Sequence, residues 1–376
     1  MKQAPRPFRR RHRGAALLTA MLTVTLVATL AAAALWQQWR AVEVEAAERA
    51  RVQSAWVLVG ALDWSRLILR EDARAGGTSG PDHLAEPWAI PLEEAKLSSF
   101  LAADKNIASD AMEGLPEAFL AGRITDAQSK LNVMNLVSNG APVPAAVASF
   151  TKLFELLGLP VQEVPILVAQ LRSAMPVAPA AASSPGTVTG TGTNTNTGTG
   201  TGTTPTTTTS GAPGGTSGGS TRTATQQTDG TSAGPLLPLR TYQLVWLGLS
   251  PSTVSALEPY VTILPEPRPI NINTASAEVL AASLPSLDLA TAKRLVARRA
   301  RKYFSSVQEA NLELPQGTSQ FNESHSVATR YFEVLGRLRL DRTWVEEHSL
   351  LQRDGIELRI LWRERGAGTT STPPKS

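Results

Sequence analysis

Few residues in this chain of 376 could do acid–base or metal chemistry, and they are scattered. The four histidines, His12, His83, His325 and His348, are far apart, and none has metal-ligand spacing to another. Cysteine is absent, which excludes disulfides, thiolate zinc sites, iron–sulfur clusters and cysteine nucleophiles. We find no G-x-S-x-G, H-E-x-x-H or phosphate-loop motif. We therefore predict that the chain is not an enzyme and has no catalytic residue and no cofactor.

Two carboxylate pairs are present, Glu93-Glu94 and Glu346-Glu347. Neighbouring residues point to different sides of a helix or strand, so we interpret both pairs as exposed charge. We interpret Asp82-His83, in the stretch "GGTSGPDH", as part of a turn. The formal net charge is only +4, and much of the positive charge precedes residue 14, so nucleic acid is not expected as the main partner.

The longest apolar run lies near the start of the chain. Residues 15–36 contain no charge, proline or glycine, and at about 1.5 Å per residue they give about 33 Å of helix, enough to cross a bilayer. Several arginines precede this run, so the positive-inside rule places the N-terminus in the cytoplasm and the rest of the chain outside it. A secretory signal peptide is the first alternative, but its apolar core is shorter. Here the helical pattern continues without a breaker to about residue 72.

The second half of this helix has an apolar stripe on an otherwise charged surface. Its members fall at helical spacing: Val52, Ala55, Trp56, Val59 and Leu62. We expect helices of partner proteins to meet this stripe and residues 24–36, because small and apolar residues pack helices together.

This N-terminus resembles that of type IV pilin-like proteins, with a basic leader that ends in glycine, an apolar half-helix and an amphipathic half-helix. The resemblance implies that a prepilin peptidase cuts between Gly14 and Ala15 and methylates Ala15. The alternative is that Gly14 is ordinary sequence beside a membrane anchor. Most such subunits carry glutamate at the fifth mature position, which is Thr19 here. A subunit that lacks this buried acid suits the end of a filament, and in this respect the chain resembles the minor pseudopilin K family of type II secretion systems.

The rest of the chain divides by composition. Residues 183–234 are rich in threonine and glycine and bury almost nothing, so we predict a disordered linker over residues 176–235. Residues 331–340 read as a strand, and Asp354-Gly355 predicts a turn between two further strands. The stretch "AFLAGRITDAQSKLNVMNLV" predicts another hairpin, which turns near Asp126.

Helices are predicted between these strands. One covers "PAAVASFTKLFELLGLP", and Gly158 ends it; others cover "PILVAQLRSAM", "TYQLVWLGL" and "SPSTVSALEPY". The stretch "ININTASAEVLAASLPSLDLATAKRLVARR" predicts two short helices, with Thr274 and Asp288 as their caps. We interpret the basic residues at the end of this stretch as a solvated face; they are Arg294, Arg298, Arg299, Arg301 and Lys302.

The last stretch resembles a helix-hairpin-helix, so an anchored DNA-binding protein is an alternative function. DNA-binding versions use a glycine-rich turn that brings backbone N–H groups close to a phosphate. Here the turn is "LPSLDL", which has no glycine and contains Asp288, an acid that repels phosphate. We therefore interpret the motif as structural.

The resemblance to the K family extends over nearly the whole chain, through "ITDAQSKLN", "FTKLFELLGL", "YQLVWLGLS", "LEPYVTILPEPRPININTASAEVLAASLP" and "SLLQRDGIELRILWR". It implies an α+β fold, in which a long N-terminal helix packs on an antiparallel pilin-like sheet that carries a large all-helical insertion. Members of the family often have an aspartate-rich, calcium-associated loop. The corresponding stretch here, "RSAMPVAPAAASSPGTVTG", has no carboxylate, so we assign no metal ligands, and calcium bound by other residues stays open.

We accordingly expect the following organisation: a cytoplasmic leader (1–14), a transmembrane helix (15–36), pilin-like segments (37–134 and 326–365), a helical insertion (135–325) and a disordered tail (366–376). The resemblance implies a single-pass protein of the bacterial inner membrane, with most of its chain in the periplasm. It implies a minor pseudopilin at the tip of a secretion filament. Its expected partners are I- and J-type minor pseudopilins, the major pseudopilin, the prepilin peptidase and membrane lipid. A tip subunit of a type IV pilus is the other alternative, since it would share the anchor.

Overall fold

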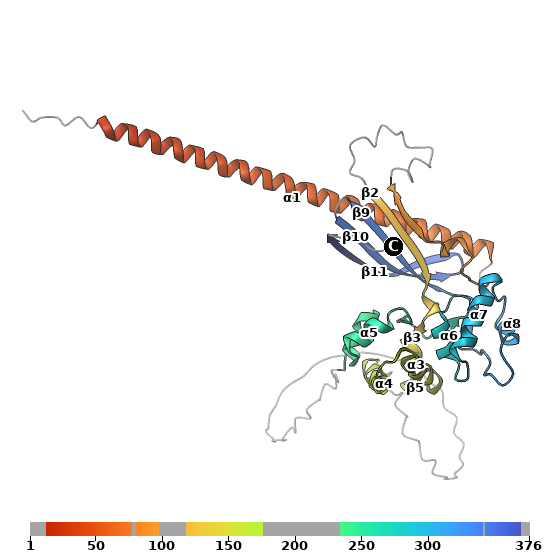
Figure 1. Ribbon diagram of the computed structural model, residues 1–376. Coiled ribbons are helices and arrows are strands. Elements are labelled where there is room, and N and C mark those ends of the chain that lie inside the picture. Colours follow the sequence, from red (N-terminus) through yellow and green to blue (C-terminus); the bar gives the residue numbers. More distant parts are fainter. Residues whose placement is uncertain (1–12, 77–79, 98–117, 176–233, 341–342, 370–376) are drawn as a thin grey trace, which may run out of the picture.

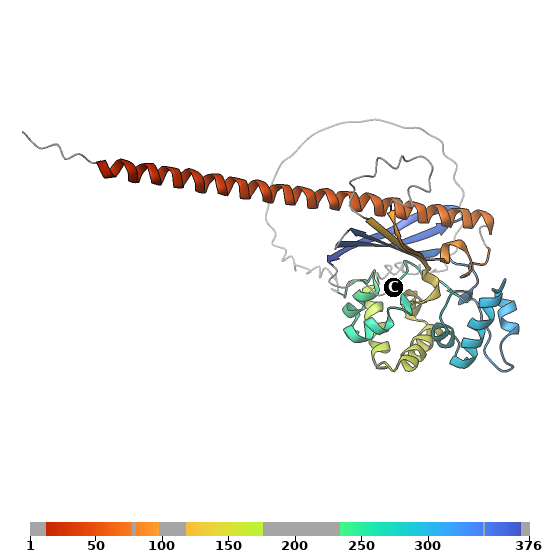
Figure 2. The same cartoon turned by 45° about the horizontal axis from the view of Figure 1, so that its top comes forward.

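The computed structural model describes residues 13–76, 80–97, 118–175, 234–340 and 343–369. One very long helix lies on one side of a five-stranded sheet, and a mostly helical region lies on the other side (Figure 1). The same arrangement is seen after a turn of 45° (Figure 2). This arrangement confirms the predicted α+β fold of a long N-terminal helix and an antiparallel sheet. Most of the predicted leader, linker and tail lies outside the described residues.

Helix α1 (Arg13–Ala75) is continuous over 63 residues, as the unbroken helical pattern predicts. Its first half projects away from the rest of the chain, and its second half lies along the sheet (Figures 1 and 2). The side chains that face the sheet recur every three or four residues, so they form one stripe. They include Leu58, Leu62, Leu69 and Ala73, all buried.

The main sheet is antiparallel throughout, with the strand order β1-β2-β9-β10-β11. Its strands are β1 (Leu92–Lys96), β2 (Ala118–Asp126), β9 (Tyr331–Leu340), β10 (Thr343–Asp354) and β11 (Glu357–Thr369). Alternate residues of β9 face α1, because side chains alternate across a strand. Phe332 and Val334 pack in one cluster with Leu62 and Leu69 of α1, and Leu338 packs with Leu58.

The predicted hairpin that turns near Asp126 is wrong. After β2 the chain leaves the sheet through a short 3-10 helix, η3 (Ala127–Ser129), and β3 (Leu131–Asn132) pairs in parallel with β6 (Val261–Thr262). Strand β2 instead pairs with β9, more than 200 residues later in the chain. The Asp126 carboxylate accepts a hydrogen bond from the Gln128 backbone N–H at 2.7 Å, which bends the chain out of the sheet.

The predicted hairpin at the C-terminal end of the sheet is confirmed, with its turn one residue later than expected. Asp354 pairs with Glu357, so the two turn residues are Gly355 and Ile356. Gly355 has a φ of 60°, and glycine at the first turn position is typical of a type II′ turn. A bulge shifts the register of β10 and β11 between Leu350 and Leu351.

In its described residues, the region between β2 and β9 is mostly helical with three short two-stranded ladders, so it is not all-helical as expected. The remaining ladders are β4 (Val137–Ser138) with β5 (Ala141–Pro142) and β7 (Ile270–Asn271) with β8 (His325–Ser326). The helices are α3 (Pro144–Leu157), α4 (Glu163–Ala174), α5 (Pro251–Leu257), α6 (Ala277–Ser283), α7 (Leu289–Arg301) and α8 (Val307–Leu312). The 3-10 helices are η4 (Val133–Leu136) and η5 (Thr241–Leu247), and η1 (Pro87–Ala89) precedes β1.

Local signals in the sequence place most ends of these helices. Gly158, with a φ of 66°, ends α3, and the Ser250 side chain caps α5. Asp288 caps α7 as predicted. The predicted cap at Thr274 is wrong, because the Ser276 hydroxyl caps α6 instead. Thr274 donates its hydroxyl hydrogen bond to Asp126.

Candidate functional site

The first half of α1 is exposed from residue 16 onward. Every residue from 16 to 49 is solvent-exposed in the isolated chain, including large side chains such as Leu22 at 68% and Leu35 at 67%. By length and composition this helix could span a membrane, and none of its most apolar window is buried by the described chain. Exposed apolar surface of this extent requires lipid or partner helices around it.

Gly14 and Ala15 lie in the first turn of α1, and Thr19 follows one turn later. The Thr19 hydroxyl donates to the Ala16 carbonyl oxygen at 3.0 Å, and Thr23, Thr25 and Thr29 make equivalent bonds. These bonds satisfy the hydroxyl groups within the helix, as hydrocarbon surroundings require. A glutamate at position 19 could not be satisfied in this way, because a carboxylate in hydrocarbon needs a cation or a proton.

The predicted partner stripe on the second half of α1 is only partly available. Leu62 is 4% exposed and packs against the sheet, so it cannot meet a partner helix. Ala55 and Val59 are half-buried, whereas Val52 is 53% exposed and Trp56 is 71% exposed. The sequence pattern could not separate these faces, because both carry apolar residues. The face around Trp56 is thus the part of the stripe that a partner could reach.

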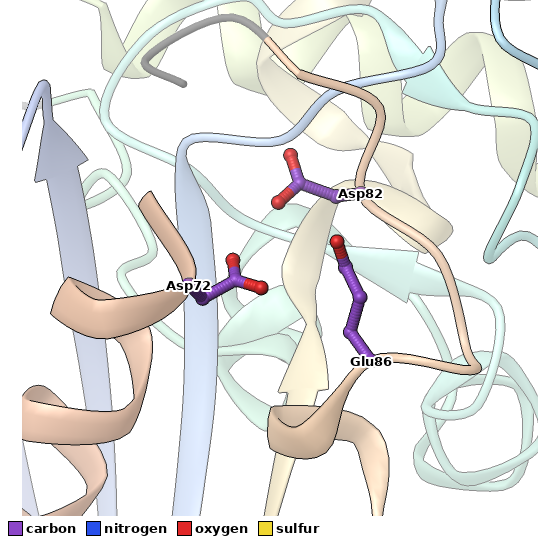
Figure 3. A group of neighbouring side chains, drawn as sticks. All are labelled: Asp72, Asp82 and Glu86. Carbon is purple, nitrogen blue, oxygen red and sulfur yellow. The ribbon is translucent and has the colours of Figure 1, made fainter. Parts of the chain in front are cut away.

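Three carboxylates gather where α1 ends: Asp72, Asp82 and Glu86 point toward one another (Figure 3), and a ligand oxygen from each lies within 4.8 Å of the others. Arg353 of β10 holds two of them, with Nη1 2.8 Å from Asp72 and Nη2 2.5 Å from Asp82. Glu86 accepts from the Trp88 indole N–H at 2.7 Å and from the His83 backbone N–H at 2.9 Å.

Burial shifts the pKa of all three acids. It raises the pKa of Glu86 to about 7, and the negative charges of Asp72 and Asp82 add to this rise. Burial also raises the pKa of Asp72 and of Asp82, although Arg353 opposes both shifts. The cluster has one guanidinium for three carboxyl groups, so a proton on Glu86 relieves the excess negative charge.

Acidic groups at this spacing could bind calcium, but a calcium ion would compete with Arg353 for the same carboxylate oxygens. The cluster is therefore explained as an ion-paired joint between α1, the 80–90 loop and β10. The sequence singled out Asp82 alone, as a turn residue. Asp72, Glu86 and Arg353 carried no local signal, because the fold brings them together from distant segments.

A second buried network ties this joint to the helical region. Asp126 at the end of β2 accepts from the Asn271 side-chain amide at 2.8 Å and from the Thr274 hydroxyl at 2.6 Å. Asn271 also donates to the Asp82 carbonyl oxygen at 3.1 Å. Asp126 is 1% exposed, and burial raises its pKa to about 6. The sheet and the helical region are thus joined by buried hydrogen bonds, which hold one relative orientation.

The α6–α7 hairpin is bonded to neighbouring segments of the helical region. Its Ser286 hydroxyl accepts from the Ser319 backbone N–H at 2.6 Å, which ties the turn to another loop. We predicted that the basic residues of α7 form one solvated face, and this prediction is wrong. Arg299 is 9% exposed and donates to the Ile272 carbonyl oxygen at 2.5 Å, and Arg298 forms ion pairs with Glu309 and Glu313.

The remaining histidines and paired acids have structural partners. His325 is buried beside the Ser283 hydroxyl, with Nε2 3.0 Å from it, and burial lowers its pKa to about 4. The Ser283 hydroxyl donates to the Leu280 carbonyl oxygen, and Nδ1 of His325 lies 3.2 Å from Asn322 Oδ1 and 3.3 Å from the Asn322 backbone nitrogen.

Three of the four paired acids, Glu94, Glu346 and Glu347, take part in ion pairs across the sheet. Glu346 pairs with Arg337, whereas its neighbour Glu347 pairs with Arg363 and Arg365 at 2.6 Å each. The two adjacent carboxylates thus point to different faces, as the strand geometry predicts. Glu347 is 4% exposed, so its interpretation as exposed charge is wrong. Glu94 pairs with Arg339 of β9. His12 lies outside the described residues.

Sequence comparisons match the region between β2 and β9 to one family. Two models described as "Type II secretion system (T2SS), protein K" match residues 129–266 and 270–328, together more than half of the chain. The chain belongs to this family.

Individual relatives agree with this assignment over the full length. The chain is 29% identical over 372 residues to the type II secretion system protein K of Pseudomonas aeruginosa, with 97% of this chain and 96% of that protein covered. It is 25% identical over 385 residues to the protein K of Pectobacterium carotovorum subsp. carotovorum, with 97% and 100% covered.

The fold is similar to that of a chain in the solved GspK-GspI-GspJ complex from enterotoxigenic Escherichia coli. The TM-score is 0.55 at 17% identity, and the match covers 85% of this chain and 98% of that one. At this identity the likeness concerns the fold.

Proposed function

We propose that this chain is a minor pseudopilin at the tip of a type II secretion filament, where it starts filament assembly with other minor pseudopilins. One observation carries the proposal: α1 is a single long helix whose apolar half no described part of the chain covers. Such a helix is suited to joining a bundle of similar helices in a membrane. Family membership favours the secretion filament over a type IV pilus.

The position at the tip follows from two further features. Position 19 is a threonine, whose hydroxyl bonds within its own helix. It therefore has no carboxylate that could pair with the terminal amine of a neighbouring subunit. The helical region lies on the side of the sheet opposite α1 and adds bulk there (Figure 2). This bulk would hinder the stacking of a further subunit above the chain in a filament. A subunit at the end of the filament needs no further subunit above it.

The proposed maturation is a cut between Gly14 and Ala15 by a prepilin peptidase, followed by methylation of Ala15. The test is the mass of the N-terminal peptide from membrane-extracted protein. We expect a chain that starts at N-methylated Ala15, and a Gly14→Val variant that keeps its leader. The matched control is Gly60→Ala in the same helix, where an added methyl group meets nothing within 4 Å. A wild-type chain that retains the arginine-rich leader would contradict this maturation.

The proposed partners are the I- and J-type minor pseudopilins, since a solved complex of a similar fold is named for GspK, GspI and GspJ. The exposed Trp56 face of α1 is the proposed contact. We expect Trp56→Ala to lower co-purification of both partners by about tenfold, a typical loss for an aromatic hot spot. Leu312→Ala is the control, because Leu312 is 87% exposed on α8, in the helical region. Equal losses for the two variants would argue against the Trp56 contact.

The tip position itself is tested by labelling. Gold attached to the chain should lie at one end of isolated filaments, at about one copy for each filament. Gold along the whole shaft would contradict the tip position while leaving membership of the filament intact. DNA binding is tested separately by retention on duplex DNA at low salt, where we expect none.

A further inference from the structure

Lys152 of α3 makes an unusual set of contacts with the turn between α6 and α7. Its ammonium group donates to the carbonyl oxygens of Leu284 at 2.7 Å, Pro285 at 3.0 Å and Leu287 at 2.7 Å. An ammonium has three N–H donors, so these three bonds use all of them. All three acceptors belong to one short turn, whose carbonyl oxygens therefore converge on a single point.

The charges around this point favour a cation. The carboxylates of Asp288 and Glu155 act on Lys152 and raise its pKa, whereas partial burial, the larger effect, lowers the pKa. Convergent backbone carbonyl oxygens are also the groups that replace the hydration shell of potassium in proteins. An ammonium and a potassium ion are of similar size and carry the same charge, so one arrangement of oxygens suits both.

The point is open to the surroundings on one side. A surface concavity of about 620 Å³ lies between α3 and the turn, and Lys152, Glu155 and Pro285 are among the residues that line it. An ion from solution could therefore reach the three carbonyl oxygens if the ammonium were absent.

We infer that the turn at residues 284–287 forms a monovalent-cation site that Lys152 fills from within the chain, and that this site takes an alkali-metal ion when the ammonium is removed. Lys152 is thus a positioning residue that fastens the α6–α7 hairpin to α3. The inference does not depend on the proposed function, because it concerns only contacts within the helical region.

The test compares thermal unfolding of the full chain in detergent in potassium, sodium and choline chloride at equal ionic strength. Wild-type Tm should be the same in all three salts. Lys152→Met should unfold about 4 °C lower in choline chloride and regain most of that loss in potassium chloride, with a saturating dependence on concentration. Lys293→Met, at an exposed position of α7, is the control and should show neither effect.

Two outcomes would overturn the inference. One is a Lys152→Met variant that is destabilised equally in all three salts, and the other is a variant as stable as the wild type. A measurement on the unaltered chain covers the case in which the variant does not fold. Lys152 should be acetylated by acetic anhydride at least tenfold more slowly than Lys293 in the native protein, because its ammonium is held by three carbonyl oxygens. Equal rates for the two lysines would also overturn it.

Discussion

The sheet is held in two different ways. On one face, α1 packs against it through apolar side chains such as Leu58, Leu62 and Leu69. At its end, the last turns of α1, the 80–90 loop and the helical region are attached through buried charges and hydrogen bonds around Arg353 and Asp126. The first attachment is non-directional, whereas the second depends on the geometry of each bond.

The two attachments differ in how strictly they fix the position of the part that they hold. An apolar face tolerates small sliding movements of the packed helix. A buried polar joint admits one arrangement, because any other leaves charges without partners. The helical region also has its own continuous apolar core, so its orientation, more than its folding, depends on the joint.

The largest effect is expected at the polar joint. Arg353→Met leaves Asp72 and Asp82 buried without their cation, which should lower the free energy of unfolding by about 3–5 kcal/mol. Urea unfolding of the full chain measures this loss. Arg359→Met is the matched control, because Arg359 pairs with Glu357 at the surface and its side chain is 68% exposed, so its change should be below about 1 kcal/mol. Equal changes for the two variants would show that the buried ion pairs of the joint contribute no more stability than an ion pair at the surface.

The apolar attachment should respond less steeply. Leu62→Ala removes a side chain that is 4% exposed between α1 and the sheet, so we expect a loss of about 3 kcal/mol. Val52→Ala is the control on the same helix and should cost less than about 1 kcal/mol, since Val52 is 53% exposed. A Leu62 loss larger than that at Arg353 would reverse the comparison between the two attachments.

The sequence predicts features that local residues determine. The length of α1, the end of α3 at Gly158, the cap at Asp288 and the Gly355 hairpin all depend on residues within a few positions of one another. The processing residues Gly14 and Ala15 are of the same kind, and their role stays a prediction.

The joint could not be predicted, because its members are far apart in the chain. Asp126 looked like a hairpin turn, since nothing nearby shows that Asn271 and Thr274 will bind its carboxylate. Thr274 looked like a helix cap for the same reason, although Ser276 takes that place. Local propensity was overruled at both positions by buried polar groups that required partners.

A smaller effect is expected where neither attachment is involved. Gly234 lies against the carbonyl group of Ser173. The described residues on either side of the segment 176–233 are therefore close together within the helical region. Replacing that segment with about six glycine and serine residues should raise the free energy of unfolding by about 1–2 kcal/mol, because a shorter loop costs less entropy to close. A loss of stability would show that the segment contributes contacts to one of the two attachments.

The smallest effect should separate the two attachments by pH. The folded-state pKa of Glu86 is about 7, above its ordinary value, so the folded chain binds more protons than the unfolded chain between those values. The contribution of Glu86 to stability should therefore fall as pH rises from 6.5 to 8, by at most about 1 kcal/mol because Glu86 is partly exposed. Asp72, Asp82 and Asp126 are shifted in the same direction, and Arg353 does not titrate in this range.

Urea unfolding at several pH values checks this slope. Glu86→Gln keeps a hydrogen-bonding side chain but has no proton to lose, so its profile between pH 6.5 and 8 should lack the Glu86 contribution. The pKa of His83 and of His325 is lowered, which adds an opposite slope that extends somewhat above pH 6.5. Both histidines are present in wild type and in Glu86→Gln, so the difference between the two profiles isolates the carboxyl group. Leu62→Ala should keep the wild-type slope, because the apolar attachment carries no titrating group. A wild-type profile that matches that of Glu86→Gln, or a difference between them that Leu62→Ala abolishes, would place the pH dependence outside the joint.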